Sequence, residues 1–402
     1  MGFKKLILFL ISLPKKSLSL ELAKFFRVPG EDDFNETVSK SALSQSRKNL
    51  DHKFLIEWGI VLLNEFYTDN EENVKRWEGF RLIGTDGSSA CVKGKKEVAE
   101  FFGEQKNQNR SVPMARLHVH FDLLNHMAVR SVISPMKESE SFHAVQALDG
   151  LEDDMLTIYD RGYAGFAFLY LNIIKKKHFV IRYPLNFSNE IKEFAASGSE
   201  SSILTFRPNK GAVKRLQALG FNAVKETEIQ ARAVRVILDT GETEILVTSL
   251  TDMDKYPNEI FKGLYFKRWG VETHFGVLKN LMQLEVFSGQ TVESIQQDFY
   301  ATVFTANLQS LIMKDCEPEL EKINERRELN YALNRNVSLG FLKDEVVKIF
   351  LTNEPESVLK KLKALFLMNL EPARPGRQFP LNMNAARPRG KHRGFKNYKS
   401  AL

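Results

Sequence analysis

Residues 265–279 read Tyr-Phe-Lys-Arg-Trp-Gly-Val-Glu-Thr-His-Phe-Gly-Val-Leu-Lys, and this stretch is the strongest single indication of the fold. On one continuous α-helix with ~100° per residue, four of its polar residues fall within an arc of roughly 60°. They are Tyr265, Arg268, Glu272 and Lys279. Apolar residues form a separate stripe, so such a helix can pack on a core and present the polar row sideways. An amphipathic helix with solvated charges fits the same pattern, and residues elsewhere in the chain are needed to decide.

The composition is that of an ordinary globular protein with a modest excess of positive charge. The chain has 402 residues, enough for two or three domains, and 43% of them are hydrophobic. The formal net charge of +7 has the sign expected for a polyanionic partner such as nucleic acid. Cys91 and Cys316 are the only cysteines. Neither a disulfide framework nor a cysteine zinc site is therefore expected, and a reducing cytoplasm is the simplest location.

The first 75 residues are predicted to be helical. The apolar run at residues 6–13 is too short to span a membrane and lacks a small-residue cleavage site, so it is expected to be a short buried helix. Residues 39–48 combine serine, glutamine, arginine and lysine. This composition suits a helix that contacts phosphates, and it equally suits a solvated helix face.

Two apolar strands are predicted to end in an aspartate that a glycine follows within two residues. Residues 80–87 read Phe-Arg-Leu-Ile-Gly-Thr-Asp-Gly, and residues 155–163 end in Asp160-Arg-Gly-Tyr. A helix at 139–148 precedes the second strand, and a crossover helix at 164–177 leads to a parallel strand at 178–183. Asp86 and Asp160 are therefore expected at one rim of a sheet, where sites of α/β proteins usually lie.

Residues 115–133 are predicted to form two antiparallel strands. On the first of them, Leu117, Val119 and Phe121 alternate with His118, His120 and Asp122. The two histidines have the spacing of strand-borne metal ligands, but solvent-facing or hydrogen-bonded histidines are the commoner interpretation. From about 184 to 258 the chain changes to short strands with a hairpin turn at 239–242, and further helices are predicted at 292–313 and 356–368. Residues 374–399 are rich in Arg and Lys without an apolar period, as in a flexible basic arm or a solubilising tail.

Asp86, Asp160 and Glu272 together suggest a metal site made of oxygen ligands. Such a site suits Mg²⁺ or Mn²⁺ rather than zinc, and two ions can bridge a scissile phosphate. Arg268 and Lys279 would bind flanking phosphates, and Tyr265 could donate a hydrogen bond to one. The polar row of the first stretch then has a shared purpose.

These residues resemble a known family. The two aspartates and the series Tyr265, Arg268, Glu272 and Lys279 are similar to the motifs of DDE transposases of bacterial insertion sequences, specifically the fourth insertion-sequence family with its Y-R-E-K signature. The resemblance covers roughly residues 80–285, with a weaker similarity at the Ser-Lys-Ser-Ala segment near the N-terminus. It implies an RNase H-like α/β domain, in which a mixed sheet is flanked by helices and a β insertion precedes the glutamate.

The resemblance also implies an activity. Such enzymes bind the terminal inverted repeats of their element, cleave DNA with divalent metal ions and join the free 3′-OH ends to target DNA, often through a hairpin and as dimers. Carried over by position, Asp86, Asp160 and Glu272 would be the metal ligands, and Tyr265, Arg268 and Lys279 would contact DNA. Hairpin-forming relatives are expected to stack a flipped base on a tryptophan of the insertion. The three tryptophans of this chain, Trp58, Trp77 and Trp269, lie outside the insertion. A Phe or Tyr would therefore have to stack the flipped base.

We therefore expect a helical DNA-binding region over 1–75, a catalytic domain over 76–285 with its β insertion at about 185–258, a helical region over 286–370 and a basic tail over 371–402. The main hypothesis is a cut-and-paste transposase that acts on double-stranded DNA, as a homodimer in the DNA complex and associated with the nucleoid. Two alternatives remain: a DNA-binding regulator that no longer cuts, and a structure-specific nuclease that does not join strands.

Overall fold

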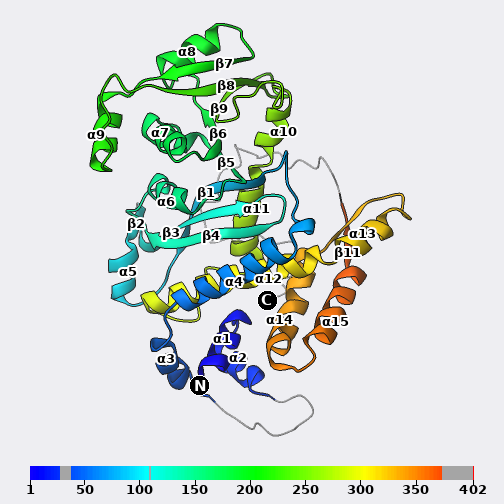
Figure 1. The fold of residues 1–402 in the computed structure, drawn as a ribbon. Coiled ribbons are helices and arrows are strands. Elements are labelled where there is room, and N and C mark those ends of the chain that lie inside the picture. Colours follow the sequence, from blue (N-terminus) through cyan, green and yellow to red (C-terminus); the bar gives the residue numbers. More distant parts are fainter. Residues whose placement is uncertain (28–37, 108–109, 374–401) are drawn as a thin grey trace.

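The computed structural model describes residues 1–27, 38–107, 110–373 and 402 (Figure 1). The predicted basic tail at 374–399 lies outside these residues. Nine strands form one mixed sheet in the order β4-β3-β1-β5-β6-β9-β8-β7, with β2 also paired to β3. Their bounds are β1 Arg81–Cys91, β2 Glu104–Asn107, β3 Arg110–Asp122, β4 Met127–Pro135, β5 Met155–Tyr159, β6 His178–Tyr183, β7 Ser201–Phe206, β8 Ile229–Ile237 and β9 Thr243–Thr248.

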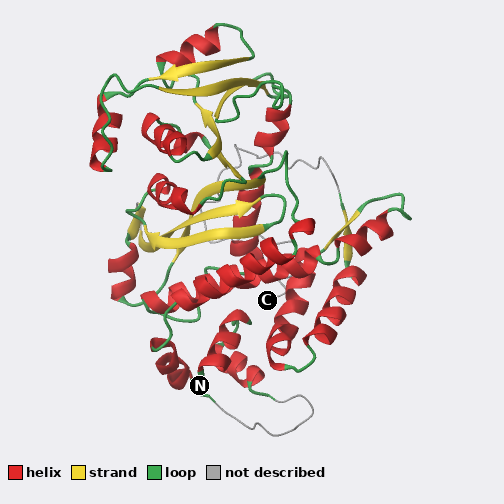
Figure 2. Ribbon diagram, in the orientation of Figure 1, coloured by secondary structure: helices red, strands yellow, loops and turns green. Residues whose placement is uncertain are grey.

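Helices flank this sheet and fill the N- and C-terminal parts of the described chain (Figure 2). The first seven are α1 Phe3–Ile11, α2 Leu18–Phe25, α3 Lys40–Lys48, α4 Lys53–Asp69, α5 Lys96–Phe102, α6 Glu140–Ala147 and α7 Phe166–Ile174. The others are α8 Asn189–Ala196, α9 Lys210–Ala218, α10 Ile260–Phe266, α11 Trp269–Gly276, α12 Val292–Lys314, α13 Glu317–Asn324, α14 Arg335–Leu351 and α15 Pro355–Met368. A short two-stranded pair, β10 Tyr331–Leu333 with β11 Leu370–Pro372, joins the end of α15 to the segment before α14.

The central strands have the expected RNase H-like arrangement. β1 pairs antiparallel with β3, and β3 pairs antiparallel with β4. On its other side β1 pairs parallel with β5, which pairs parallel with β6. Helix α7 makes the crossover from β5 to β6, because two parallel neighbours need a connection that returns along the sheet. The predicted α/β fold, a mixed sheet flanked by helices, is confirmed.

The strands predicted between 184 and 258 are present as β7, β8 and β9, and β8 and β9 form the predicted hairpin. They make no separate sheet, because β9 pairs antiparallel with β6 and so extends the central sheet. Helices α8 and α9, which we had not predicted, lie in the same segment. The connection after β9 leads directly into α10, so this segment sets where the chain returns to the carboxylate region.

Helix α12 is the core of the helical part of the molecule. It runs beside α4 along β4, and α1 and α14 also pack on it (Figure 1). The predicted buried helix at the N-terminus is confirmed as α1, in which Leu6 to Ile11 are all at most 4% exposed. Within the described ranges, no helix has the length and apolar character needed to cross a membrane.

The arginine of helix α3, Arg47, is buried and is not accessible to a ligand. Ser39 caps the helix by accepting a hydrogen bond from the amide of Ala42. Arg47 is buried and its guanidinium donates to Asp298 at 2.8 Å and to Gln297 at 2.7 Å, both on α12. The interpretation of residues 39–48 as a phosphate-contacting helix is therefore wrong for Arg47, which ties α3 to α12 instead.

A second buried arginine organises the segment before α10. Arg232 on β8 is 1% exposed and donates to the carbonyl of Tyr256 at 2.7 Å, to Asn258 Oδ1 at 2.6 Å and to the carbonyl of Leu250 at 3.2 Å. The carbonyl acceptors belong to the loop that follows β9. That loop is therefore held in place by one guanidinium rather than by regular secondary structure.

Replacing Arg232 with methionine is expected to lower the free energy of unfolding by about 3 kcal/mol or more, because buried carbonyl groups lose their donor. Denaturant unfolding followed by circular dichroism measures the change. Arg207→Met is the matched control, since Arg207 is exposed and pairs only with Glu228, a surface contact worth ~0–1 kcal/mol. Equal stability of the two variants would show that Arg232 does not hold the loop.

Candidate active site

Asp86 lies on β1, and Asp160 directly follows β5, the parallel neighbour of β1, at a matching position. The last paired residues of β1 and β5 are Gly84 and Ile158. Two residues further along each strand bring the chain to Asp86 and Asp160, so both carboxylates leave the sheet side by side where the parallel pairing stops. The sequence prediction that the two aspartates share one rim is in agreement with this register.

The prediction that Asp86 ends its strand is wrong. β1 continues to Cys91, because β3 pairs with it along this whole length, from Asp86 opposite Val119 to Cys91 opposite Met114. Only the parallel partner β5 stops early. Asp86 is thus held on a strand that is paired on one side and free of β5 on the other.

Local hydrogen bonds fix both aspartates. Oδ1 of Asp86 accepts from the amide of Gly87 at 2.8 Å. Asp160 caps the short 3-10 helix Arg161–Tyr163 (η3), and its Oδ1 accepts from the amide of Gly162 at 2.7 Å. In each case one carboxylate oxygen is used by the backbone, which leaves the other for a ligand.

Glu272 reaches the same region from α11, but not on the single regular helix that we predicted. The stretch 265–279 is divided into the end of α10, the start of α11 at Trp269 and a π-helix, Val277–Leu281. Tight turns at 267–268 separate the first two, with the amide of Arg268 bonded to the carbonyl of Tyr265. The arc calculated for a continuous helix therefore does not hold across the whole stretch.

Two glycines let α11 approach β1 closely. A Cβ atom added at Gly270 would lie 2.9 Å from Leu123 Cδ2, and one added at Gly84 would lie 2.8 Å from the same atom. Leu123 is thus clamped between helix and strand, and larger residues at either glycine would push α11 away. This packing decides how near Glu272 comes to the aspartates.

The three carboxylates interact electrostatically. The pKa of Asp86 is raised to about 6, chiefly by burial and also by the charges of Asp160 and Glu272, while the Gly87 amide and Arg268 act against the shift. Arg268 is 6% exposed; its Nη2 donates to Glu272 Oε1 at 2.8 Å, and its Nη1 lies 4.0 Å from Asp86 Oδ2. This guanidinium therefore partly neutralises a crowded acidic site.

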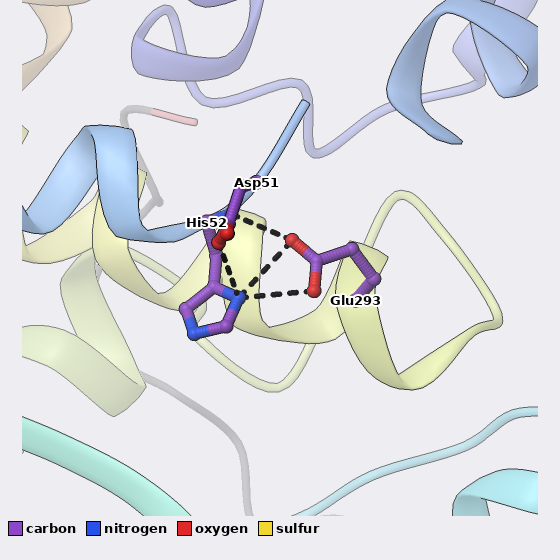
Figure 3. Close-up of side chains that lie close together, drawn as sticks. All are labelled: Asp51, His52 and Glu293. Carbon is purple, nitrogen blue, oxygen red and sulfur yellow. Dashed lines mark hydrogen bonds and ion pairs between the residues drawn. The ribbon is translucent and has the colours of Figure 1, made fainter. Parts of the chain in front are cut away.

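The three carboxylates do not form a compact ligand set. Within the part of the chain that the structure describes, one group of three potential ligands has ligand atoms all within 4.8 Å, and it comprises Asp51, His52 and Glu293. Figure 3 shows that His52 Nδ1 points at both oxygens of Glu293, at 2.9 and 3.1 Å. The His52 amide also donates to Glu293 at 2.6 Å, so this cluster is a tie between α4 and α12.

A family model for the transposase DDE domain matches residues 79–308, more than half of the chain. This chain belongs to that family. It is 23% identical over 291 residues to the transposase InsG for insertion sequence element IS4 of Escherichia coli K12, a match that spans 70% of this chain and 62% of that protein. It is 26% identical over 184 residues to the putative transposase InsZ of the same strain, across 43% of this chain and 59% of that one. The matches thus span less than two thirds of either relative.

Among solved structures, the piggyBac transposase synaptic complex with hairpin DNA aligns over 91% of this chain and 77% of its own, with a TM-score of 0.41 and 9% identity. The resemblance to transposases of the IS4 group that we drew from the motifs is confirmed by the family model and the two bacterial relatives.

DDE domains act with divalent metal ions, and the donor set here fits such an ion. All three side chains offer carboxylate oxygens, the ligands that Mg²⁺ and Mn²⁺ prefer. The pKa of Asp86 is raised chiefly by burial and to a smaller extent by the charges of Asp160 and Glu272, so its ionised form is not fully compensated. A bound cation would relieve that repulsion and favour closer approach of the carboxylates.

The three residues predicted to contact DNA lie at the site but face inward. Tyr265 is 7% exposed, and its hydroxyl has no hydrogen-bond partner within the described part of the chain. Lys279 Nζ donates to Ser88 Oγ and to the carbonyl of Ser89, both at 2.6 Å. Together with the buried Arg268, they contact protein groups of the DDE domain in this structure.

The two histidines of β3 that lie opposite Thr85 and Gly87 of β1 are further functional candidates, and we predicted their environment only in part. His118 and His120 are buried on β3, at 1% and 0% exposure, and both are hydrogen-bonded: His120 to Thr85 and His118 to Tyr163. The hydrogen-bonded interpretation is therefore correct and the solvent-facing one is wrong, because helices cover this face of the sheet as well. Tyr163, the last residue of the Asp-Arg-Gly-Tyr series, was the signal that we did not use.

Proposed function

We propose that this chain is a DNA transposase that binds the terminal inverted repeats of its insertion sequence, cleaves the DNA strands there and transfers them to target DNA. Asp86, Asp160 and Glu272 would hold the divalent metal ions. The observation that carries the proposal is the matched register of Asp86 and Asp160 on β1 and β5, with α11 packed close enough for Glu272 to influence the pKa of Asp86.

Divalent ions, Mg²⁺ or Mn²⁺ and two in number, would supply charge for a phosphate that is attacked and for the oxygen that leaves. The protein residues place them. Asp86 and Asp160 each keep one oxygen that the backbone amides of Gly87 and Gly162 do not use. Arg268 would exchange its contacts with the carboxylates for a DNA phosphate, which is the bidentate partner that suits a guanidinium.

The DNA contacts are proposed from the same region. Tyr265 and Lys279 would join Arg268 on the backbone of the transposon end, and we propose a homodimer in the DNA complex. The division of the chain into a helical region at 1–75, a catalytic domain at 76–285 and a helical region at 286–370 is proposed on the same basis. The positive net charge of the chain suits this polyanionic partner.

The test is incubation of the purified full-length protein with its flanking DNA ends and Mg²⁺, followed by mapping of the broken strands and of any hairpins. Strand breaks at the element ends followed by joining to a target duplex are expected. End binding without breaks would instead identify a silent regulator. Breaks without joining would identify a nuclease.

Replacing Lys279 with alanine is expected to weaken end binding and to reduce the slope of log affinity against log salt concentration by about 1, since one phosphate contact is lost. Fluorescence anisotropy at several salt concentrations measures this slope. Lys262→Ala is a control, because Lys262 is paired at the surface with Asp239. An unchanged slope together with lower stability would mean that Lys279 serves to hold Ser88 and Ser89 of β1.

A further inference from the structure

A buried polar layer lies on the face of β1 opposite to Asp86. Side chains alternate along a strand, so Thr85 and Gly87 point away from the face that carries Asp86. Their partners across the antiparallel pair are His120 and His118 of β3, respectively. Within the fold, this face is covered by α6 and α7.

Each histidine makes one hydrogen bond to a segment that carries an aspartate. His120 Nδ1 lies 2.9 Å from Thr85 Oγ1, directly before Asp86 in the chain. His118 Nε2 lies 3.2 Å from the hydroxyl of Tyr163, which closes the turn that Asp160 caps. Strand β3 is therefore hydrogen-bonded, through its two histidines, to both segments that carry an aspartate.

The hydrogen bonds of this layer are shielded from water, and its histidine rings and phenol are neutral. Thr85 is 0% exposed and Tyr163 is 2% exposed, so these bonds do not compete with bulk water. Burial lowers the pKa of His118 to about 2 and that of His120 to about 3, so both rings are neutral near pH 7. Burial raises the pKa of Tyr163 well above its usual value, so the phenol keeps its proton and can donate a hydrogen bond to Nε2 of His118.

Other residues fix the layer from α6. His143 Nε2 lies 2.7 Å from Ser134 Oγ of β4, and its ring centroid is 5.6 Å from that of His118. Glu140 lies so close to β1 that a Cβ atom at Gly87 would be 2.3 Å from its side-chain carbons. A side chain in place of Gly87 would therefore have to displace the carboxylate end of Glu140.

We infer that His118 and His120, through Tyr163 and Thr85, are positioning residues that set the separation of Asp86 and Asp160 and hence the affinity of the site for its divalent ion. This inference rests on the proposed function, in which the two aspartates are metal ligands. Residues behind the ligands of a metal site typically change its affinity 10- to 100-fold. Here they would act through the backbone of β1 and through the turn of η3.

The experiment compares Thr85→Val and Tyr163→Phe in the full-length protein. Each variant removes one hydrogen bond and keeps the shape of the side chain. Mn²⁺ binding is measured by electron paramagnetic resonance, with Asp160→Asn as the background from other sites. The Mn²⁺ dissociation constant is expected to rise ~10-fold in each variant. The Mg²⁺ concentration that gives half-maximal DNA cleavage should rise in parallel, with the rate at saturating Mg²⁺ little changed.

Two controls separate positioning from stability. Thr85→Ser keeps the hydroxyl and should keep wild-type Mn²⁺ affinity. Tyr159→Phe removes a hydroxyl that is equally buried on β5 but has no hydrogen-bond partner among the residues that the structure describes, so it too should leave Mn²⁺ affinity unchanged. Thermal melts of all four variants show whether a change in affinity merely follows a loss of stability.

The outcomes distinguish this inference from the proposed function. Equal Mn²⁺ affinity in Thr85→Val, Tyr163→Phe and the wild type would overturn the inference, and so would a wild type that binds no Mn²⁺ above the background. The wild type could instead bind Mn²⁺ more tightly than Thr85→Val and Tyr163→Phe, as expected, but cleave no DNA. In that case the positioning role stands and the proposed function fails.

Discussion

Replacing Asp160 with asparagine is expected to slow metal-dependent cleavage of the element ends by on the order of 10³-fold or more. A neutral amide is a poorer ligand than a carboxylate, and the charge stabilisation that a metal site supplies is several kcal/mol, at about 1.4 kcal/mol for each tenfold change in rate. Asp86→Asn and Glu272→Gln should have effects of the same order. Single-turnover cleavage of labelled end DNA measures the rates.

End binding should persist in all three variants, since DNA affinity depends mainly on phosphate contacts with cations. Glu259→Gln is the matched control, because Glu259 is an exposed carboxylate at the N-terminal end of α10 and should leave cleavage unchanged. Undiminished cleavage by any one of the three variants would remove that residue from the proposed metal site.

Acidification from pH 7.5 to 5 is expected to lower the free energy of unfolding, and His118, His120 and Asp86 together are expected to contribute about 3 kcal/mol to this loss. The pKa values of buried His118 and His120 are about 2 and about 3 in the fold, below the ordinary value of about 6.5 in the unfolded chain. The unfolded state therefore binds more protons. The stabilising contribution of each histidine is fully present above about pH 6.5 and is lost as the pH falls from there towards 3. At pH 5 the loss is about 2 kcal/mol for each histidine.

Asp86 acts in the opposite direction. Its pKa is raised to about 6 in the fold, so on acidification the folded state takes up this proton first and regains about 1 kcal/mol by pH 5. Urea unfolding of the metal-free protein at the two pH values measures the net change. His120→Asn keeps an amide near the position of Nδ1 without the titratable ring, and should reduce the acid effect by about 2 kcal/mol. The same pH dependence in this variant would exclude His120 as a source.

Local sequence patterns were sufficient to predict most elements. Strict alternation identified β3, the Asp-Thr-Gly-Glu turn identified the hairpin of β8 and β9, and the apolar run at 6–13 identified α1 as buried. These predictions succeeded because each depends on residues that are close together in the chain. Asp86 and Asp160 could be assigned to one rim because parallel strands have their carboxyl ends on the same side of a sheet.

Long-range packing decided the rest. The end of β1 was misplaced because its extension to Cys91 depends on pairing with β3, and nothing near Asp86 in the sequence encodes that partner. The single helix predicted for 265–279 is divided at 267–268. Arg47 lies in a polar stretch typical of a solvent-exposed helix. It is nevertheless buried and paired with Asp298, some 250 residues away in the chain.

By itself, the sequence determined most of the order of strands and helices, the three carboxylates that we propose as metal ligands and the family to which the chain belongs, because residue types and local periods are written directly in it. Only the tertiary structure decided that Arg268 lies among those carboxylates and that Lys279 is bonded to β1. Only the tertiary structure, too, placed two neutral histidines behind Asp86. The physical reason is that burial and electrostatic environment are properties of neighbours in space, and these neighbours come from segments of the chain that no local pattern connects.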